Sequence, residues 1–174
     1  MMNLTLVIPA KHESESLPIV LEELKKYQFN IKIVLDRSDI DTINSIKNYD
    51  CEIIYQGGKG YGNALIEGIS SVTTEFFCIF NADGSFNPIE LKNMLEMITE
   101  NNSDFIFASR YEKNCGSEDD DIVTFIGNFI FTKLGNIFFR LKITDILYTY
   151  VMGKTQSAKN LDLKQNDFTF CVEL

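Results

Sequence analysis

The sequence predicts an α/β protein with a mostly parallel central sheet and helices on both faces. Short apolar runs of strand length alternate with helical segments up to Arg110, a pattern typical of parallel sheets. Hydrophobic residues make up 45% of the 174 positions and charged residues 24%, which is ordinary for a globular protein. No internal repeat and no linker rich in Pro, Gly or Ser divides the chain, so we expect residues 1–174 to form one domain.

Local signals place the individual elements. Residues 4–8 are an apolar run that Pro9 ends, which predicts a buried strand. Ser16 and Pro18 predict a helix that continues to about Tyr27, with Ser16 as the N-cap and Pro18 in the first turn. The same reasoning predicts further strands at 31–35, 51–55, 76–80 and 104–108, and further helices at 42–48, after the glycine-rich turn 57–62, and from Pro88 onward. In such sheets the binding residues lie in loops beyond the carboxyl ends of the strands.

The pattern changes after Arg110. Residues 114–121 are polar and acidic, and we favour a solvated loop over an acidic binding site. Residues 123–141 are helical in pattern and apolar on nearly all faces, which predicts either a buried helix or contact with a membrane or partner. Burial in the core is the interpretation we favour. Residues 170–174 have the pattern of a strand or helix start, with nothing after them to cover it.

Composition excludes several classes of protein. The net charge of −9 argues against nucleic acid as a partner, because binding to phosphates needs a basic face. The four cysteines, at 51, 78, 115 and 171, form no CxxC pair, so we expect free thiols in a reducing cytoplasm rather than a zinc or redox site. We expect no signal peptide at the N-terminus and no membrane span, because the apolar runs are much shorter than about 20 residues.

The strongest candidate for chemistry is the turn that follows residues 76–80. Asp83 lies there between Ala82 and Gly84, at the carboxyl end of a central strand, where it could bind a hard divalent cation. The alternative is a plain turn in which the Asp83 side chain caps the backbone and Gly84 supplies a positive φ. The glycine-rich turn 57–62 could present N–H groups and Lys59 to an anion, but tight packing explains its glycines as well, and we favour packing slightly.

Other candidates each have two interpretations. Asp36 could accept hydrogen bonds from a nucleobase or ribose, or cap the loop that follows it. Arg110 could reach a diphosphate in bidentate fashion, or pair with an acidic neighbour. Asp145 could be a cap or a site residue. His12 is the one histidine in the chain, and beside Lys11 we interpret it as a surface residue rather than as a catalytic base.

Several segments occur in the order and spacing of one known family. They are 7–13 (VIPAKHE), 34–38 (VLDRS), 60–64 (GYGNA), 81–85 (NADGS), 108–111 (ASRY) and, further on, 127–128 (GN) and 144–145 (TD). With these motifs the chain resembles the family 2 glycosyltransferases of the GT-A fold, and most of all their dolichol-phosphate (polyprenyl-phosphate) mannosyltransferase-like branch. The resemblance implies a three-layer α/β/α domain that is shortened at its C-terminus relative to the family.

The resemblance also implies an activity. A sugar would move, with inversion, from a UDP- or GDP-linked donor to a polyprenyl phosphate or a related glycan acceptor. Asp83 would bind Mg²⁺ or Mn²⁺ at the donor diphosphate, and Arg110 and Asp145 would complete the catalytic set. As the glycosidic bond breaks, negative charge accumulates on the leaving diphosphate, where a metal and Arg110 can neutralise it. Together with Lys59, the expected nucleotide-sugar-binding residues are Pro9, Ala10, Lys11, Glu13, Val34, Asp36, Asn81, Ala82, Asp83 and Ser85.

A lipid phosphate is already an anion, so a strong general base is dispensable in this branch of the family. With free thiols and no signal peptide, the expected location is the cytoplasm, with the cytoplasmic face of a membrane as the further expectation. The partners we expect are the donor, the lipid-phosphate or glycan acceptor and, through the apolar segment, a membrane surface. Nucleic acid is not among them.

The chain departs from the family pattern at several positions. Asn81 replaces the first Asp of the DxD motif, Leu35 the first Asp of VDD, and Phe125 an expected arginine. Lys11 and His12 replace a tyrosine and an asparagine. These departures, with the shortened C-terminus, motivate an alternative: a catalytically degenerate domain that binds a nucleotide-sugar or a partner without transfer. A sugar-phosphate nucleotidyltransferase is a weaker alternative, because those enzymes carry an Arg- and Lys-bearing glycine-rich loop where this chain has residues 9–13.

Overall fold

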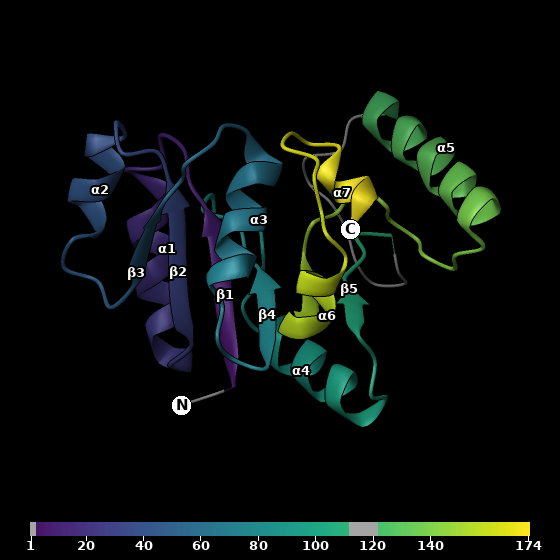
Figure 1. The fold of residues 1–174 in the computed structure, drawn as a ribbon, viewed down its shortest axis with the longest axis horizontal. Coiled ribbons are helices and arrows are strands. Elements are labelled where there is room, and N and C mark those ends of the chain that lie inside the picture. The colour runs from purple at the N-terminus through teal and green to yellow at the C-terminus, as the bar shows by residue number, and fades with distance from the viewer. Residues whose placement is uncertain (1–2, 112–121) are drawn as a thin grey trace.

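The computed structural model describes residues 3–111 and 122–174 and has a six-stranded sheet in the order β3-β2-β1-β4-β6-β5 (Figure 1). The strands are β1 (Leu4–Pro9), β2 (Asn30–Leu35), β3 (Glu52–Tyr55), β4 (Phe76–Ile79), β5 (Phe105–Phe107) and β6 (Val151–Lys154). The helices are α1 (Ser16–Leu24), α2 (Ile40–Ile46), α3 (Tyr61–Ser71), α4 (Glu90–Glu100), α5 (Ile122–Phe139), α6 (Thr155–Asn160) and α7 (Phe170–Glu173), with a 3₁₀ turn at Lys25–Tyr27. Strands β1 to β4 pair in parallel, and β6 runs antiparallel to both β4 and β5. The predicted α/β class with a mostly parallel sheet is confirmed.

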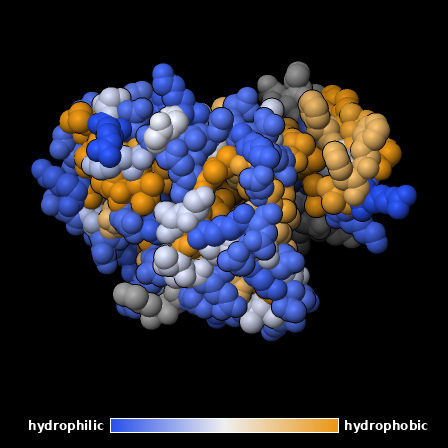
Figure 2. Space-filling model, viewed as in Figure 1, coloured by the Kyte–Doolittle hydropathy of each residue, from blue (hydrophilic) through white to orange (hydrophobic). Residues whose placement is uncertain are grey.

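Helix α5 lies to one side of the sheet (Figure 1). The apolar atoms gather over this helix in Figure 2. Its exposed large side chains are Ile126, Phe129, Ile130, Phe131, Leu134, Ile137, Phe138 and Phe139. The expectation that this segment is buried in the core was therefore wrong. Apolar content alone does not say which faces a sheet covers, and most of this helix extends beyond the sheet.

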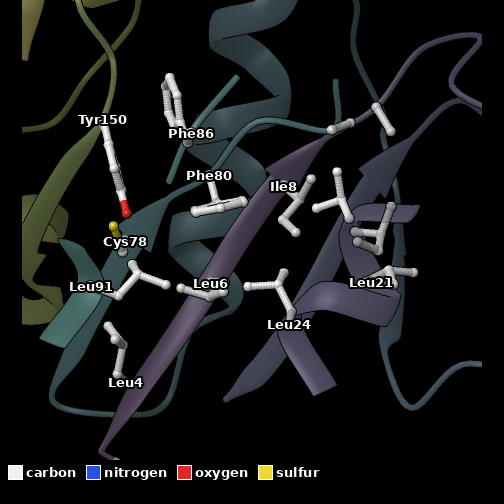
Figure 3. Packing of buried hydrophobic residues seen from close by; sticks show 14 of the residues in the cluster. Leu4, Leu6, Ile8, Leu21, Leu24, Cys78, Phe80, Phe86, Leu91 and Tyr150 are labelled. Carbon is white, nitrogen blue, oxygen red and sulfur yellow. The ribbon is translucent and has the colours of Figure 1, made fainter. Parts of the chain in front are cut away.

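The core consists of two layers of side chains, one on each face of the sheet. Successive residues of a strand point to opposite faces. Leu4, Leu6 and Ile8 of β1 therefore contact the layer that α1, α2 and α4 cover, which Figure 3 shows from close by. Val7 points the other way, into the layer covered by α3, α6 and α7. The domain is thus a three-layer α/β/α sandwich, with Tyr150 completing the first layer beside β4 (Figure 3).

Strand β6 was not predicted from the sequence. Its four residues lie between β4 and β5, and Gly153 at its centre faces aromatic rings on both neighbours. A Cβ at Gly153 would come within 2.7 Å of ring carbons of Phe77 and Phe105, so the close packing of β6 needs a glycine there. A short strand that contains glycine has almost no hydrophobic pattern, which is why the sequence did not predict β6.

Two predicted helix starts needed correction. Ser16 is the first residue of α1 rather than its cap, and its hydroxyl donates to the Glu13 carboxylate. Helix α2 begins at Ile40, two residues before the predicted start, because the side chain of Asp39 accepts a hydrogen bond from Thr42 N at 3.4 Å. The prediction that Pro18 lies in the first turn of α1 is confirmed.

The last fourteen residues fold back over α3. Residues 161–169, called here the C-terminal strap, lead into helix α7. Phe170 is fully buried against the α3 side of the sheet, so the expectation that 170–174 lacks a cover was wrong. The predicted acidic loop 114–121, with Cys115, lies outside the described residues. Within 3–111 and 122–174, no helix has the length and apolarity needed to cross a bilayer.

Candidate active site

A pocket of about 580 Å³ opens at the carboxyl edge of the sheet. It lies beyond the ends of β1, β3 and β4, where ligands of such sheets are expected. Seven residues predicted from the sequence line it together: Pro9, Ala10, Lys11, Glu13, Asn81, Ala82 and Asp83. Segments more than sixty positions apart along the chain are thus brought to one cavity.

The other predicted site residues do not line this pocket. Val34 is fully buried in the core beside Val7 and Gly68, so its side chain serves packing. Ser85 lies behind Asp83 in the same turn, while Asp36 and Lys59 are exposed at the neighbouring strand ends. Arg110 and Asp145 form a separate cluster, described below.

The turn that carries Asp83 is ordered by its own side chains. The backbone N of Ser85 donates to Asp83 Oδ1 at 2.9 Å, and Asn81 Nδ2 donates to Ser85 Oγ at 3.0 Å. Gly84 has a φ of 82°, as the simple turn interpretation expected. The cation-binding and the plain-turn interpretations of Asp83 are therefore compatible, because the turn holds the carboxylate at the pocket while using only one of its oxygens.

These residues fit a hard divalent cation. Asp83 Oδ2 and Asn81 Oδ1 have no hydrogen-bond partner in the described part of the chain, and both residues line the pocket. A carboxylate and an amide oxygen are ligands that Mg²⁺ or Mn²⁺ accepts. Across residues 3–111 and 122–174, no group of three or more His, Cys, Asp or Glu side chains could hold a metal ion. Phosphate oxygens and water would have to complete the ligand shell.

The loop after β1 is held rigidly against α2. His12 N donates to Asp39 Oδ2 at 2.7 Å, and Glu13 N donates to Thr42 Oγ1 at 3.0 Å. His12 itself adopts a φ of 60°, and its side chain is exposed, as predicted for a surface residue. Burial raises the pKa of the Asp39 carboxyl, but hydrogen bonds from His12 and Thr42 outweigh burial and leave that pKa below its usual value. The loop therefore presents Lys11 and Glu13 from a fixed backbone.

The edge of the pocket near β2 carries positive charge around one carboxylate. Asp36 accepts hydrogen bonds from Ser38 N at 2.8 Å and Ser38 Oγ at 2.7 Å. These bonds, followed by the charges of Lys59 and Lys11, hold the pKa of Asp36 below its usual value. Lys59 thus lies close enough to influence the site, although it does not line the cavity.

The glycine-rich turn does not form a phosphate cradle. Gly57 N and Gly58 N donate to the carboxylate of Glu67 at 2.8 and 3.2 Å, so these N–H groups already bind an anion of the chain itself. Gly60 and Gly62 instead allow close backbone packing. A Cβ at Gly60 would lie 2.1 Å from Asn166 O, and one at Gly62 would lie 2.2 Å from Gln165 O, both in the C-terminal strap. The packing interpretation of these glycines is the one that the structure shows.

Arg110 and Asp145 form a buried ion pair. The Asp145 side chain is 0% exposed and accepts from Arg110 Nε at 2.8 Å and Nη2 at 3.1 Å. Asn128 of α5 donates to the same carboxylate at 2.6 Å. The guanidinium also lies over the ring of Tyr148, 5.1 Å from its centre. Of the two interpretations of Arg110, the structure shows the pairing with an acidic neighbour, and a contact with diphosphate stays a prediction.

Sequence reasoning missed a second wall of the pocket. This wall comprises Gln56, Gly60, Tyr61, Ala64, Leu147, Thr149, Phe168 and Cys171. Burial raises the pKa of Tyr61 to about 12 and that of Cys171 to about 11, so both stay protonated at neutral pH. Tyr61 could have been found from its place beside Gly60 in the glycine-rich turn. Nothing in the local sequence marks Phe168 or Cys171.

The fold and this pocket define a class of protein. A three-layer sandwich with a carboxylate-bearing turn at the end of a central strand places the chain among the GT-A-like α/β domains. The chain belongs to glycosyl transferase family 2, whose family model matches residues 5–162.

Curated relatives agree with this assignment. The low-salt glycan biosynthesis hexosyltransferase Agl6 of Haloferax volcanii is 26% identical over 178 aligned positions, which cover 98% of this chain and 43% of that protein. An uncharacterised glycosyltransferase of Mycobacterium tuberculosis is 29% identical over 91 positions, or 52% of this chain and 41% of that one. The chain thus spans less than half the length of either relative.

Solved structures share the fold. Glucosyl-3-phosphoglycerate synthase from Mycobacterium tuberculosis, in complex with Mn²⁺, UDP and glucosyl-3-phosphoglycerate, matches with a TM-score of 0.76 at 10% identity, over 97% of this chain and 62% of its own. Mannosyl-3-phosphoglycerate synthase from Rubrobacter xylanophilus matches with a TM-score of 0.69 at 16% identity, over 88% of this chain and 53% of its own. At these identities the likeness concerns the fold alone.

Proposed function

We propose that this domain transfers a hexose, with inversion, from a nucleoside-diphosphate sugar to a phosphate-bearing acceptor. One observation carries the proposal: the pocket joins the ordered loop after β1 to the turn that holds the Asp83 carboxylate. The hexosyltransferase relative and the neighbour solved with Mn²⁺ and UDP support this assignment.

The residues divide into two groups by position. Pro9, Ala10, Lys11 and Glu13 contact the nucleoside, with Asp36 at the neighbouring strand end. Ser16 donates to the Glu13 carboxylate and fixes its direction before any ligand arrives. This preorganisation reduces the ordering cost of binding.

The second group faces the diphosphate. Asp83 Oδ2 and Asn81 Oδ1 would hold a divalent ion, while Ser85 N and the Gly84 turn keep Asp83 aimed at the pocket. When bound, the ion neutralises charge that develops on the leaving diphosphate. Lys11 lines the same cavity and adds positive charge. An amide at position 81 carries no charge, so this site holds its metal less tightly in the absence of donor than a paired carboxylate site would.

We propose a polyprenyl phosphate as the acceptor, as in the lipid-phosphate branch that the motifs resemble. The exposed apolar face of α5 supports this choice, because such a surface suits the edge of a membrane. Residues 122–144 contain Lys133, Arg140 and Lys142 and no acidic residue, whereas four acids precede them at 118–121. We therefore place the C-terminal end of α5 against anionic headgroups.

The experiment is calorimetric titration of the full chain with UDP-glucose and GDP-mannose, with and without Mn²⁺. We expect Mn²⁺ to strengthen the binding of one donor at least tenfold, and Asp83→Asn to abolish that gain. Asp50→Asn, at an exposed position before β3, is the matched control and should behave as wild type. Binding that is indifferent to Mn²⁺, or a gain that survives Asp83→Asn, would falsify the proposal.

The alternative is a degenerate domain that binds without transfer, for which Asn81 at the first motif position is the specific observation. Incubation with the bound donor and undecaprenyl phosphate separates the two functions. Release of nucleoside diphosphate that depends on the acceptor supports transfer, and tight donor binding without such release supports the degenerate domain.

A further inference from the structure

The pocket has a second, largely apolar half that the residues discussed above do not use. It consists of Tyr61, Ala64, Leu147, Phe168 and Cys171, with the hydroxyl of Thr149 as a polar group. These residues come from α3, from the segment before β6 and from the C-terminal part of the chain. Lys11 and Asp83, of the polar half, line the same cavity.

An exposed aromatic ring is fixed in this half. The exposed fraction of Phe168 is 74%, yet its ring stacks on Tyr61, with 5.0 Å between the centres and 18° between the planes. Tyr61 is anchored in turn, because its hydroxyl lies 3.0 Å from that of Thr149. One face of Phe168 is therefore covered, and most of the ring is open to solvent at the pocket. A large apolar side chain that stays this exposed contributes little to folding by burial.

The strap that carries Phe168 is held at several points. The Glu173 carboxylate accepts hydrogen bonds from Lys164 N at 2.9 Å and Gln165 N at 2.8 Å. Asn166 O accepts from Asn63 N at 3.1 Å, where Gly60 and Gly62 let the two backbones meet. The aromatic ring is thus positioned by backbone contacts and does not depend on a ligand to order it.

The order of strands tells which part of a donor reaches this ring. The nucleoside loop follows β1, and the Asp83 turn follows β4, the next strand in the sheet. The strand beyond β4 is β6, and Leu147 and Thr149 lie just before it. The Tyr61 hydroxyl lies 3.0 Å from that of Thr149, so a donor that extends from β1 past β4 would bring the group after its diphosphate to the Tyr61–Phe168 stack. That group is the sugar.

We propose that the Tyr61–Phe168 pair forms the subsite for the hexose ring of the donor, with Phe168 stacking on the apolar face of that ring. The inference rests on the proposed function and assigns this chain's own residues to the transferred sugar. A pyranose has a face of C–H groups that packs on an aromatic ring, and a rim of hydroxyls that needs polar partners. Thr149 supplies such a partner beside the stack, so this half matches both sides of a sugar.

The test compares how much the sugar adds to donor affinity. Calorimetry with Mn²⁺ gives Kd for UDP and UDP-glucose, and for GDP and GDP-mannose, on the full chain. The ratio of the two Kd values for the nucleotide that binds measures the contribution of the sugar. We expect Phe168→Ala to reduce that ratio by about threefold to tenfold, from the usual range for an aromatic contact. The Kd for the free nucleotide should change less than twofold.

Three further variants separate stacking from other roles of Phe168. Phe168→Tyr keeps the flat ring and should keep the ratio. Phe168→Leu keeps an apolar anchor for the strap but removes the flat face, so it should behave like Phe168→Ala. Ile19→Ala removes an equally exposed apolar side chain from α1, at 72%, and should leave all four Kd values unchanged.

The possible results separate the sugar subsite from the proposed function. An unchanged ratio in Phe168→Ala, a sugar that adds nothing in the wild type, or an equal loss for nucleotide and nucleotide-sugar overturns the subsite while leaving the proposed function intact. Failure of all four ligands to bind in the presence of Mn²⁺ overturns the proposed function, and the subsite with it.

Discussion

The carboxylate of Asp145 holds the guanidinium of Arg110 through two hydrogen bonds and ties both residues to α5. Asn128 of that helix donates to the same carboxylate, and Thr132, one turn later, lies 3.4 Å from Asn128 Oδ1. The Thr132 hydroxyl also accepts from Ile146 N at 3.2 Å. A helix that lies largely outside the core is thus attached through a buried polar cluster. Its attachment to the segment that carries Asp145 and Ile146 therefore includes buried hydrogen bonds.

Asp145→Ala should lower the free energy of unfolding by about 3 kcal/mol, because it removes the buried carboxylate that binds both Arg110 and Asn128. Urea unfolding measures the loss. Asp104→Ala is the control, since Asp104 forms a more exposed pair with Lys154, and it should cost less than about 1 kcal/mol. Equal losses in the two variants would contradict the role assigned to the buried pair.

Stability should depend on pH through Asp39. Its pKa is lowered in the folded protein, so the charged form stabilises the fold above the unfolded value of about 3.9. That contribution is lost as the pH falls through the lower folded pKa. We expect Asp39→Ala to cost about 1–2 kcal/mol at pH 6, from the lost cap of α2 and the lost bond to His12 N.

The measurement is urea unfolding of wild type and Asp39→Ala between pH 6 and pH 3. The difference between them should narrow only below about pH 4, where Asp39 begins to bind a proton. Asp50→Ala serves as the exposed control. A difference that stays constant to pH 3 would show that the charge of Asp39 contributes nothing.

Helix α5 should bind vesicles that contain phosphatidylglycerol. Ile137→Ser removes an apolar group that is 72% exposed, and we expect about fivefold weaker binding for a loss of about 1 kcal/mol of apolar transfer. Cosedimentation with vesicles measures the partition. Ile19→Ser, equally exposed at 72% but on α1, should bind as wild type does. Equal weakening in both variants, or no preference over phosphatidylcholine, would remove α5 as the membrane surface.

Much of the fold could be predicted because most of its strands have a clear local sequence pattern. Residues 4–8 and 76–80 are continuous apolar runs, and such runs specify buried parallel strands without any knowledge of their partners. The position of a strand in the sheet, by contrast, does not follow from that strand's own sequence pattern. The pattern of β6 is interrupted by Gly153, whose reason lies in two rings on other strands. The exposure of α5 was equally hidden, since a helix rich in phenylalanine has the same sequence whether or not a sheet covers it.

The polar half of the pocket was predictable for a similar reason. Lys11, Glu13 and Asp83 lie in the loops that follow β1 and β4, and the carboxyl ends of parallel strands meet at one edge. Val34 was predicted to bind the nucleotide-sugar, but its side chain, one residue before the end of β2, points into the core. Phe168 reaches the pocket only through backbone contacts between the C-terminal strap and α3, which no local pattern encodes.

The backbone contact between Asn63 and Asn166 joins positions about a hundred residues apart. Contacts of such long range form late, because the entropy cost of closing a large loop precedes the stabilisation that the contact provides. During synthesis, a ribosome-bound chain can pair the four strands β1, β2, β3 and β4 with one another well before the strap has emerged. The part of the cavity wall that contains Phe168 is therefore built after these strands. A nascent chain would pair these strands before the strap could close this side of its cavity.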